Sequence, residues 1–587
     1  MPLTKLFKTE INISPARLSL LAGLSLVGLG LALYLPTMLK LPLTRAEAMY
    51  ALIPKEMLDS GQWLTPTLNG TRYLDKPPLL YWLNLLAYHL FGVTAWTARL
   101  PTLGIALGEV WLTFLVGRRL LGNRAAWLGG FALLTSIGFF SLHMELLTDH
   151  LITLFLLGAL YFLLRWRESP ILGWALAFHL CLVGGVFSKG LIGIVFPLLI
   201  AGGLALQLKE TRLKSLFFHP WGLLLLGALT LSWFGFQEWN NPGFFRHHII
   251  NEHVLRFLGR RQPPDISPFT VRDFYIFAGM WLLPWSVLLP EALYRFWGAT
   301  RPGGEVGPGG RLLLIWSAVV LGFFTLSAMR IEYYSLPALP ALALICGWRL
   351  ERGLNTSKNW SLAGALLIIG LMGLTLRILL PHLEQMMAEN RREFLGMLPS
   401  LTPLALRVIY LIPLLAFLGA LAALFNRGRA ALLGYGALAL VLLYYTSLSL
   451  VALSPYLSDR LAGEYVRGHS RPRDVVVMEN IEEFEYVASL AFYAGRRIQL
   501  VRRGELPQFP YPVTPRENYL ISPGDLKELW QGPGTLFLLA DDCQILEPFC
   551  RAAPVALQAG GKRLLTNGAR EKQAASLPQG RPAGIRK

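Results

Sequence analysis

The sequence predicts a polytopic α-helical membrane protein with a small soluble α/β domain at its C-terminal end. Of its 587 residues, 54% are hydrophobic and only 15% are charged, and the mean hydropathy is +0.46. The apolar residues fall in blocks of about 17–25 residues, the length that an α-helix needs to cross a bilayer. After residue 454 these blocks stop, and short apolar segments alternate with polar ones. These observations exclude a wholly soluble enzyme.

The blocks predict about thirteen spans, beginning near residues 18, 98, 126, 148, 172, 190, 216, 272, 311, 334, 359, 404 and 430. The net charge of +18 could indicate nucleic-acid binding, but the basic residues stand at the ends of apolar blocks. With the N-terminus in the cytoplasm, every short connection on the cytoplasmic side is basic, as the positive-inside rule requires. We therefore expect the C-terminal part to lie on the outer side.

The first span, from Leu18 to about Met38, follows basic residues, as the apolar core of a signal peptide does. It is too long for a signal-peptide core and lacks a small-residue cleavage site, so we expect it to stay as an anchor. The transmembrane domain should cover residues 1–454, with long outer loops at 40–97 and 237–271.

Strand-like and helix-like segments alternate in residues 455–569. Residues 474–478, 498–501 and 535–540 have the composition of buried strands, and residues 482–493 that of a helix. This alternation predicts an α/β domain. Residues 570–587 are polar and predicted to be disordered. Cys543 and Cys550 could pair on an oxidising side, or remain two thiols.

The first outer loop is unusual for a connector, because charged and aromatic side chains are interleaved between Arg45 and Trp82. A loop folded against the membrane surface has this composition. An interfacial loop without any chemistry is the alternative.

Ionisable groups near membrane depth are costly and mark functional sites by default. The chain has five such places, all on the predicted outer side: Glu47 with Asp75 and Lys76; Glu145 with Asp149; Lys189; Glu252, His253 and Arg256 followed by Asp265; and Arg330 with Glu332, Tyr333 and Tyr334. Their convergence on one side predicts a single polar cavity that binds a substrate.

The residue types indicate what that cavity would bind. Four cations suit a phosphate: Lys76, Lys189, Arg256 and Arg330. The candidates for a general base, and with His253 for the ligands of a divalent metal, are Glu47, Asp75, Asp149 and Asp265. Each has a bland alternative, since Lys189 and Arg330 could be interfacial anchors, and Asp149 could only cap a helix.

Several blocks resemble one family of membrane proteins. The segments Glu47–Tyr50, Gly61–Pro66 and Tyr73–Pro78, with Glu252–Phe257, Ser188–Gly190 and Arg330–Pro340 after them in the same order, resemble the aminoarabinose transferases. These belong to the wider class of protein-mannosyltransferase-like membrane glycosyltransferases, which have the GT-C fold. Residues 489–496 are similar to the C-terminal domain of the family, so the resemblance extends over nearly the whole chain.

The resemblance implies an enzyme that transfers a sugar from a polyprenyl-phosphate carrier to a lipid or glycan acceptor at the outer face of the inner membrane, as in aminoarabinose transfer to lipid A. It implies that Lys76 and Lys189 bind the carrier phosphate, that Asp75 and His253 hold a divalent metal such as Zn, Mg or Mn, and that Asp149 lines the reaction centre. The family commonly has Asp-Glu where this chain has Ala46-Glu47, and a histidine where it has Asp265.

Two other functions remain open at this stage. One is transfer of mannose or another hexose from a polyprenyl phosphate to protein or glycan. The other is a lipid-carrier flippase or transporter, although transporters favour repeated halves and polar sites near the bilayer midplane, whereas here the polar groups gather at one face.

Overall fold

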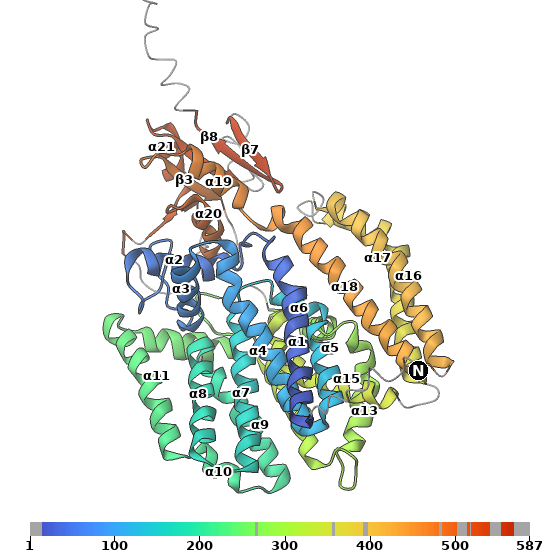
Figure 1. Ribbon diagram of the computed structural model, residues 1–587. Helices are drawn as coiled ribbons and strands as arrows, with labels where there is room; N and C mark the ends of the chain where they lie inside the picture. The colour runs from blue at the N-terminus through green and yellow to red at the C-terminus, as the bar shows by residue number, and fades with distance from the viewer. Residues whose placement is uncertain are drawn as a thin grey trace, which may run out of the picture.

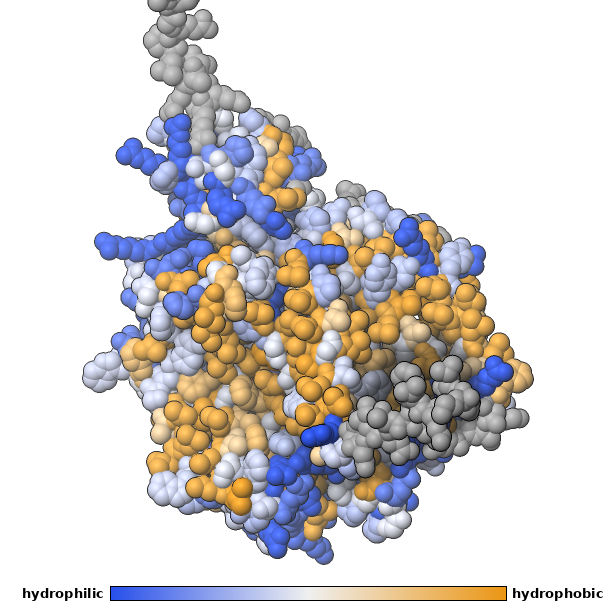
Figure 2. All heavy atoms as spheres, viewed as in Figure 1, coloured by the Kyte–Doolittle hydropathy of each residue, from blue (hydrophilic) through white to orange (hydrophobic). Residues whose placement is uncertain are grey.

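A computed structural model describes residues 14–264, 268–354, 359–390, 397–425, 427–479, 484–501, 514–516, 518–540 and 553–568. The chain forms a bundle of helices, and the C-terminal α/β domain sits on one end of it (Figure 1). Apolar side chains cover the side of the bundle seen in Figure 2, between more polar surfaces above and below. This arrangement confirms the predicted fold class.

Eight helices in the described part of the chain are long and apolar enough to cross a membrane, or nine if the bent pair α12 and α13 is one span. The eight are α1 (Pro15–Met38), α4 (Ala95–Leu121), α7 (Thr148–Glu168), α8 (Leu172–Lys189), α14 (Arg311–Leu326) together with the short 3-10 turn before it (Pro308–Gly310), α16 (Trp360–Asn390), α17 (Leu398–Leu424) and α18 (Gly428–Leu457). The protein is therefore a multi-pass membrane protein.

The remaining predicted starts also fall on helices: α5 (Asn123–Leu134), α9 (Ile192–Leu208), α11 (Pro220–Asn240) and α15 (Leu339–Gly353). Of these, α5, α9 and α15 are shorter than 18 residues, so they do not meet the length for a full span. The pair α12 (Val271–Trp281) and α13 (Leu289–Ala299) bends by 108°. A hydropathy pattern cannot distinguish such short or bent helices from straight spans.

Small residues let buried helices approach closely. A Cβ added to Gly347 of α15 would lie 2.3 Å from the backbone nitrogen of Gly129 in α5. Close backbone approach of this kind is how helices associate in lipid, where apolar burial gives little driving force.

The first outer loop folds into a compact unit of α2 (Ala48–Ser60), a hairpin of β1 (Thr67–Leu68) and β2 (Thr71–Arg72), and α3 (Leu79–Phe91). Asn69 and Gly70 form the two-residue turn of the hairpin, with φ of 54° and 76°. Asn-Gly is favoured there because both positions need a positive φ.

The C-terminal domain has one six-stranded mixed sheet in the order β5-β4-β3-β6-β8-β7. Its strands are β3 (Val475–Glu479), β4 (Gln499–Val501), β5 (Leu520–Ile521), β6 (Leu536–Ala540), β7 (Val555–Ala559) and β8 (Lys562–Thr566), and its helices are α19 (Arg460–His469), α20 (Val487–Ala494) and α21 (Pro523–Gln531). Strands β3 to β6 pair in parallel, and β7 and β8 are antiparallel. Cys543, Cys550 and residues 570–587 lie outside the described residues.

The C-terminal domain is bonded to the first outer loop. The side chain of Asn69 donates to the backbone oxygen of Ile498 over 2.7 Å and accepts from the Ile498 backbone nitrogen over 2.9 Å. Arg45 forms an ion pair of 3.3 Å with the buried Asp459. The first outer loop is thus bonded to the C-terminal domain on one side, while its helix α3 packs against α4 of the bundle.

Candidate active site

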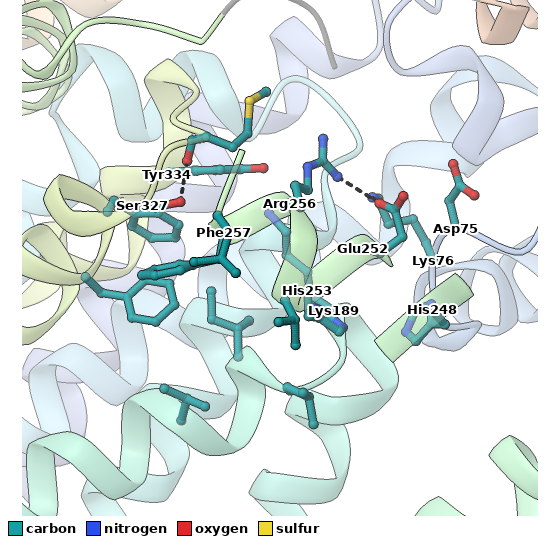
Figure 3. A pocket seen from close by; sticks show the side chains of 18 of the residues that line it. Asp75, Lys76, Lys189, His248, Glu252, His253, Arg256, Phe257, Ser327 and Tyr334 are labelled. Carbon is teal, nitrogen blue, oxygen red and sulfur yellow. Dashed lines mark hydrogen bonds and ion pairs between the residues drawn. The ribbon is translucent and has the colours of Figure 1, made fainter. Parts of the chain in front are cut away.

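A cavity of about 350 Å³ lies between the first outer loop, the end of α8, the segment after α14, and η2 (Arg246–Leu255), a π-helical segment of the second outer loop (Figure 3). π-Helical turns are rare and are found frequently at functional sites. One part of the wall is charged and comprises Asp75, Lys76, Lys189, Glu252 and Arg256. Another part is apolar and comprises Leu191, Ile192, Val195, Val254, Phe257, Leu258, Phe323 and Phe324.

Lys189, the last residue of α8, is bonded to Asp149 in the first turn of α7. Its ammonium group donates to both carboxylate oxygens, over 2.6 and 2.7 Å. The same nitrogen lies 4.2 Å from the ring centroid of Tyr334 and 5.9 Å from that of Tyr333. The carboxylate and the ring faces therefore hold the lysine charge at the cavity wall.

Glu252, a residue of η2, is surrounded by three cationic side chains. Its carboxylate lies 2.6 Å from Arg261, 3.0 Å from Arg256 and 3.9 Å from Lys76. Burial by itself would raise the pKa of Glu252, but these three cations outweigh it and lower that pKa. Glu252 is thus an anion that orders three positive side chains.

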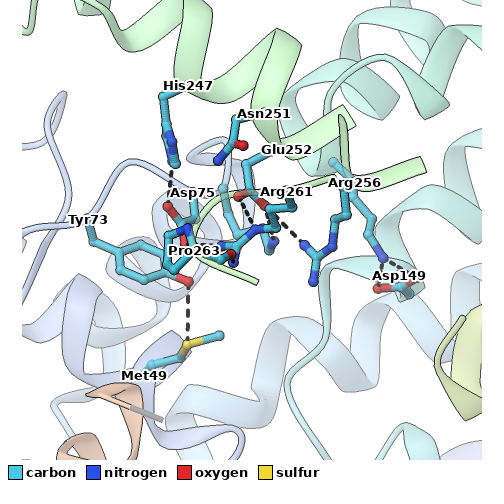
Figure 4. Close-up of polar contacts among 12 residues, drawn as sticks. Met49, Tyr73, Asp75, Asp149, His247, Asn251, Glu252, Arg256, Arg261 and Pro263 are labelled. Atoms are coloured by element: carbon cyan, nitrogen blue, oxygen red, sulfur yellow. Dashed lines mark hydrogen bonds and ion pairs between the residues drawn. The ribbon is translucent and has the colours of Figure 1, made fainter. Parts of the chain in front are cut away.

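Asp75 accepts from Nε2 of His247 over 2.8 Å, and its other oxygen lies 3.6 Å from Arg261 (Figure 4). Arg261 therefore contacts both Asp75 and Glu252. One network of ion pairs and hydrogen bonds joins the first outer loop, which carries Asp75, to the second, which carries His247 and Arg261.

His253 packs against the turn that follows Lys189. Gly190 has φ of 71°, and a Cβ there would lie 2.1 Å from His253 Nε2, so only glycine fits. Burial, and next the charge of Lys76, lowers the pKa of His253 to about 4. The imidazole is therefore neutral at physiological pH.

The residues do not fit a divalent metal in this arrangement. Asp75, His247 and Glu252 could each offer one ligand atom, and these atoms lie within 4.8 Å of one another. However, Arg261 already contacts both carboxylates, and two further cations neutralise Glu252. Of the ligands predicted from the sequence, Asp75 and His253 line the same cavity, but the histidine bonded to Asp75 is His247, and Asp265 lies outside the described residues. The metal stays a prediction.

Two predicted site residues make structural contacts away from the cavity lining. Glu47 is fully buried and forms an ion pair with Arg99, while the backbone nitrogens of Thr44 and Leu146 donate to it over 2.8 and 3.2 Å. Arg330 donates to the backbone oxygens of Phe269, over 3.1 Å, and Ser327. The catalytic role of Glu47 and the phosphate role of Arg330 stay predictions that these contacts do not favour.

Sequence reasoning missed His247 and Arg261. A signal for His247 was available, since it precedes Glu252 by five residues, the spacing that a π-helix stacks on one face. That spacing differs from the periods of α-helices and strands, and π-helices are rare. Arg261 follows η2 in irregular backbone, so no repeat of the sequence places it.

Known proteins with similar sequences include membrane glycosyltransferases. Residues 75–234 match the family model described as dolichyl-phosphate-mannose-protein mannosyltransferase. The undecaprenyl phosphate-alpha-4-amino-4-deoxy-L-arabinose arabinosyl transferase 1 of Pseudomonas fluorescens is 29% identical over 53% of this chain and 54% of its own length. The corresponding transferase of Pseudomonas aeruginosa is 30% identical over 57% of this chain and 60% of its own length. The chain thus matches a little more than half of these relatives.

Solved structures share the fold over almost the whole chain. ArnT from Cupriavidus metallidurans, solved bound to undecaprenyl phosphate, has a TM-score of 0.76 at 21% identity, covering 93% of this chain and 97% of that one. Its apo structure has the same TM-score and identity and covers 98% of that chain. The resemblance read from the sequence is therefore confirmed: the chain is similar in sequence to the aminoarabinose transferases, and it shares the fold of ArnT.

Proposed function

We propose that this protein transfers a sugar from a polyprenyl-phosphate carrier to a lipid or glycan acceptor. The observation that carries the proposal is the cavity, in which a wall of lysine and arginine side chains adjoins a wall of leucine, isoleucine and phenylalanine. A polyprenyl phosphate has the same two parts, an anionic head and an apolar chain. The names of the curated relatives support this carrier, because they act with undecaprenyl phosphate.

The charged side chains would bind the carrier phosphate and stabilise it as the leaving group. In the reaction the bond between the anomeric carbon and the phosphate oxygen breaks, and a bond from the acceptor oxygen to that carbon forms. Negative charge grows on the phosphate, where Lys76, Lys189 and Arg256 would neutralise it. Donors already fixed in a partly dehydrated site need no reorganisation during the reaction, which makes them effective.

The carboxylates would position these cations and the sugar. Glu252 holds Lys76 and Arg256, and Asp149 holds Lys189. Asp149 is also the candidate to accept the proton of an acceptor hydroxyl. Direct attack by the acceptor inverts the anomeric carbon and needs no covalent enzyme intermediate.

Two acceptor and sugar classes fit this reaction. The names of the curated relatives favour aminoarabinose as the sugar, with lipid A as the acceptor that the resemblance implies, whereas the family model is named for transfer of mannose to protein. Ala46 favours a sugar or acceptor different from that of the aminoarabinose enzymes, because these commonly have an aspartate at this position. The charged cavity is lined by the first outer loop, the end of α8 and η2, and not by the middles of the spanning helices, which argues against a transporter.

The cavity and the C-terminal domain would face the periplasm or exterior. The short helix α10 (Arg212–Phe217), with Arg212 and Lys214, lies at the end of the bundle remote from the domain (Figure 1). Basic connections favour the cytoplasmic side.

Purified protein in liposomes tests the proposal. We expect an undecaprenyl-phosphate-linked sugar to be consumed and the acceptor to gain the mass of that sugar, measured by mass spectrometry. Donors with aminoarabinose and with mannose, each offered with lipid A and with an acceptor peptide, separate the two classes. Lys76→Ala is the control for transfer that depends on the cavity. Absence of transfer from every polyprenyl-phosphate sugar, with movement of the carrier between leaflets instead, would contradict the proposal.

A further inference from the structure

A second cluster of ionisable side chains lies inside the helical bundle and does not line the cavity. Glu109 lies near the middle of α4, His143 between α6 (Ile137–Leu142) and α7, and His150 in the first turn of α7. All three side chains are fully buried. A carboxylate oxygen and one nitrogen of each imidazole lie within 4.8 Å of one another. Ionisable groups so deep in a membrane protein require an explanation.

The hydrogen bonds of the two histidines define which nitrogen carries the proton. Nδ1 of His143 lies 2.7 Å from the backbone oxygen of Phe139, and Nε2 of His150 lies 2.9 Å from that of Leu142. A carbonyl oxygen only accepts, so each of these nitrogens is the donor. The two rings also stack, with centroids 3.9 Å apart, which two cations would oppose. Nε2 of His143 and Nδ1 of His150 therefore present lone pairs.

The cluster consequently contains acceptors without a donor. Nε2 of His143, Nδ1 of His150 and both oxygens of Glu109 are buried and have no hydrogen-bond partner among the described residues. If Glu109 were protonated, its hydroxyl could donate to only one of the two imidazole nitrogens, and the other nitrogen would remain without a donor. The 3.4 Å between Glu109 Oε1 and His143 Nε2 is also long for a hydrogen bond. Each buried acceptor left unpaired destabilises the fold.

We propose that Glu109, His143 and His150 bind a divalent transition-metal ion, for which zinc is the best fit. Two histidines and one carboxylate form a known zinc ligand set, and imidazole favours zinc over magnesium or calcium. Two ligand atoms about 2.1 Å from a tetrahedral ion lie about 3.4 Å apart. The Glu109–His143 separation has this value. Both histidines also donate their other ring N–H to a backbone oxygen, as metal-bound histidines do.

A polar group for the fourth position is available on the same helix face. Thr113 follows Glu109 by one turn of α4, and its hydroxyl is buried without a hydrogen-bond partner among the described residues. The hydroxyl, or a water that it holds, would complete four-coordination.

The ion would have a positioning role, because its site is buried and separate from the cavity. It would join the middle of α4 to the start of α7. The residue before His150 is Asp149, which holds Lys189 at the cavity wall. The metal would thus fix the helix end from which that carboxylate projects, whatever sugar the cavity accepts.

Metal analysis of the purified full-length protein tests this inference. After dialysis against EDTA, wild-type protein should retain one equivalent of metal per chain more than Glu109→Gln, measured by inductively coupled plasma mass spectrometry. Protein from cobalt-supplemented cells should show visible d–d absorption bands that Glu109→Gln lacks. Neither readout depends on activity, so both stand even if the proposed reaction is wrong.

His179→Gln is the matched control. His179 is a fully buried histidine of α8 whose ring nitrogens lie 2.9 and 3.4 Å from the backbone oxygens of Ala175 and Phe217. This variant should keep the metal and the bands. If Glu109→Gln does not fold, His143→Gln replaces it in both measurements. Equal metal content in wild type and the cluster variants, or no tightly held metal in wild type, would overturn the proposal in favour of a protonated Glu109.

Discussion

Lys189 and Asp149 link the cavity wall to α7, because the ammonium group at the end of α8 bonds both oxygens of a carboxylate at the start of α7, over 2.6 and 2.7 Å. The two side chains are only 16% and 6% exposed. A pair in this position both stabilises the fold and places a positive charge at the cavity wall.

A double-mutant cycle should separate these two roles. Lys189→Met leaves the Asp149 carboxylate buried without its partner, and breaking such a pair costs about 3–5 kcal/mol. Adding Asp149→Asn removes that charge, so the double variant should melt at a higher temperature than Lys189→Met alone. Transfer should be lost in both. With the single variant Asp149→Asn completing the cycle, additive effects of the two substitutions on stability would show that the pair contributes nothing.

Lys76→Ala should reduce turnover by roughly a hundredfold or more, as loss of one electrostatic donor does. Lys76 is partly buried and lies 3.9 Å from Glu252, and Pro77 and Pro78 restrain the backbone that follows it. Lys76→Arg should restore only part of the rate, because the guanidinium is broader. Near-normal transfer by Lys76→Ala would assign the phosphate to Lys189 or Arg256.

Asn69→Gly should lower the melting temperature. Glycine keeps the positive φ of this position but removes both hydrogen bonds to Ile498, leaving buried backbone groups that cost about 1–3 kcal/mol each. Limited proteolysis should also release the C-terminal domain faster than in wild type. The neighbouring variant Gly61→Asn, at an exposed position with φ of 68°, serves as the control and should leave proteolysis unchanged.

Cysteine labelling checks the orientation. Gly468 is exposed at the end of α19, with no atom near a Cβ built there. In a background without the four native cysteines, Gly468→Cys should react with an impermeant maleimide added to intact cells whose outer membrane is opened. Reaction only after disruption of the inner membrane would place the domain, and with it the cavity, on the cytoplasmic side.

Stability should fall as the pH decreases from about 6.5 towards about 4, in part because of His253. Its pKa is lowered to about 4 in the folded state from an ordinary value of 6.5, so in this window the unfolded chain binds the proton and the folded chain does not. The slope from one such group is at most about 1.4 kcal/mol per pH unit. Thermal melts across this range should show a shallower loss for His253→Gln. An identical slope would mean that His253 is solvated in the folded protein.

The sequence predicted the elements of the fold well, because hydropathy blocks and basic connections depend only on local composition. Lys76, Lys189, Arg256 and Tyr334 were predicted to lie together, and they line one cavity. The three charged residues could be identified because charges near membrane depth are rare, and Tyr334 was included because it lies close to Arg330 in the sequence.

Partners distant in the sequence could not be predicted in this way. Glu47 has the same composition signal as the cavity residues, but Arg99, 52 residues later, pairs with it in the interior. Likewise nothing local distinguishes His247 from His253 as the partner of Asp75. Such pairings depend on the packing of whole helices, which periodicity does not encode.

The hydrogen bonds between Asn69 and Ile498 join residues 429 positions apart, so they bear on the order in which the protein is made. The loop that carries Lys76 leaves the ribosome among the first segments, and strand β4 beside Ile498 among the last. The loop therefore cannot form these bonds until almost all of the helices have been made. The joint between this loop and the C-terminal domain is therefore one of the last contacts of the protein to form.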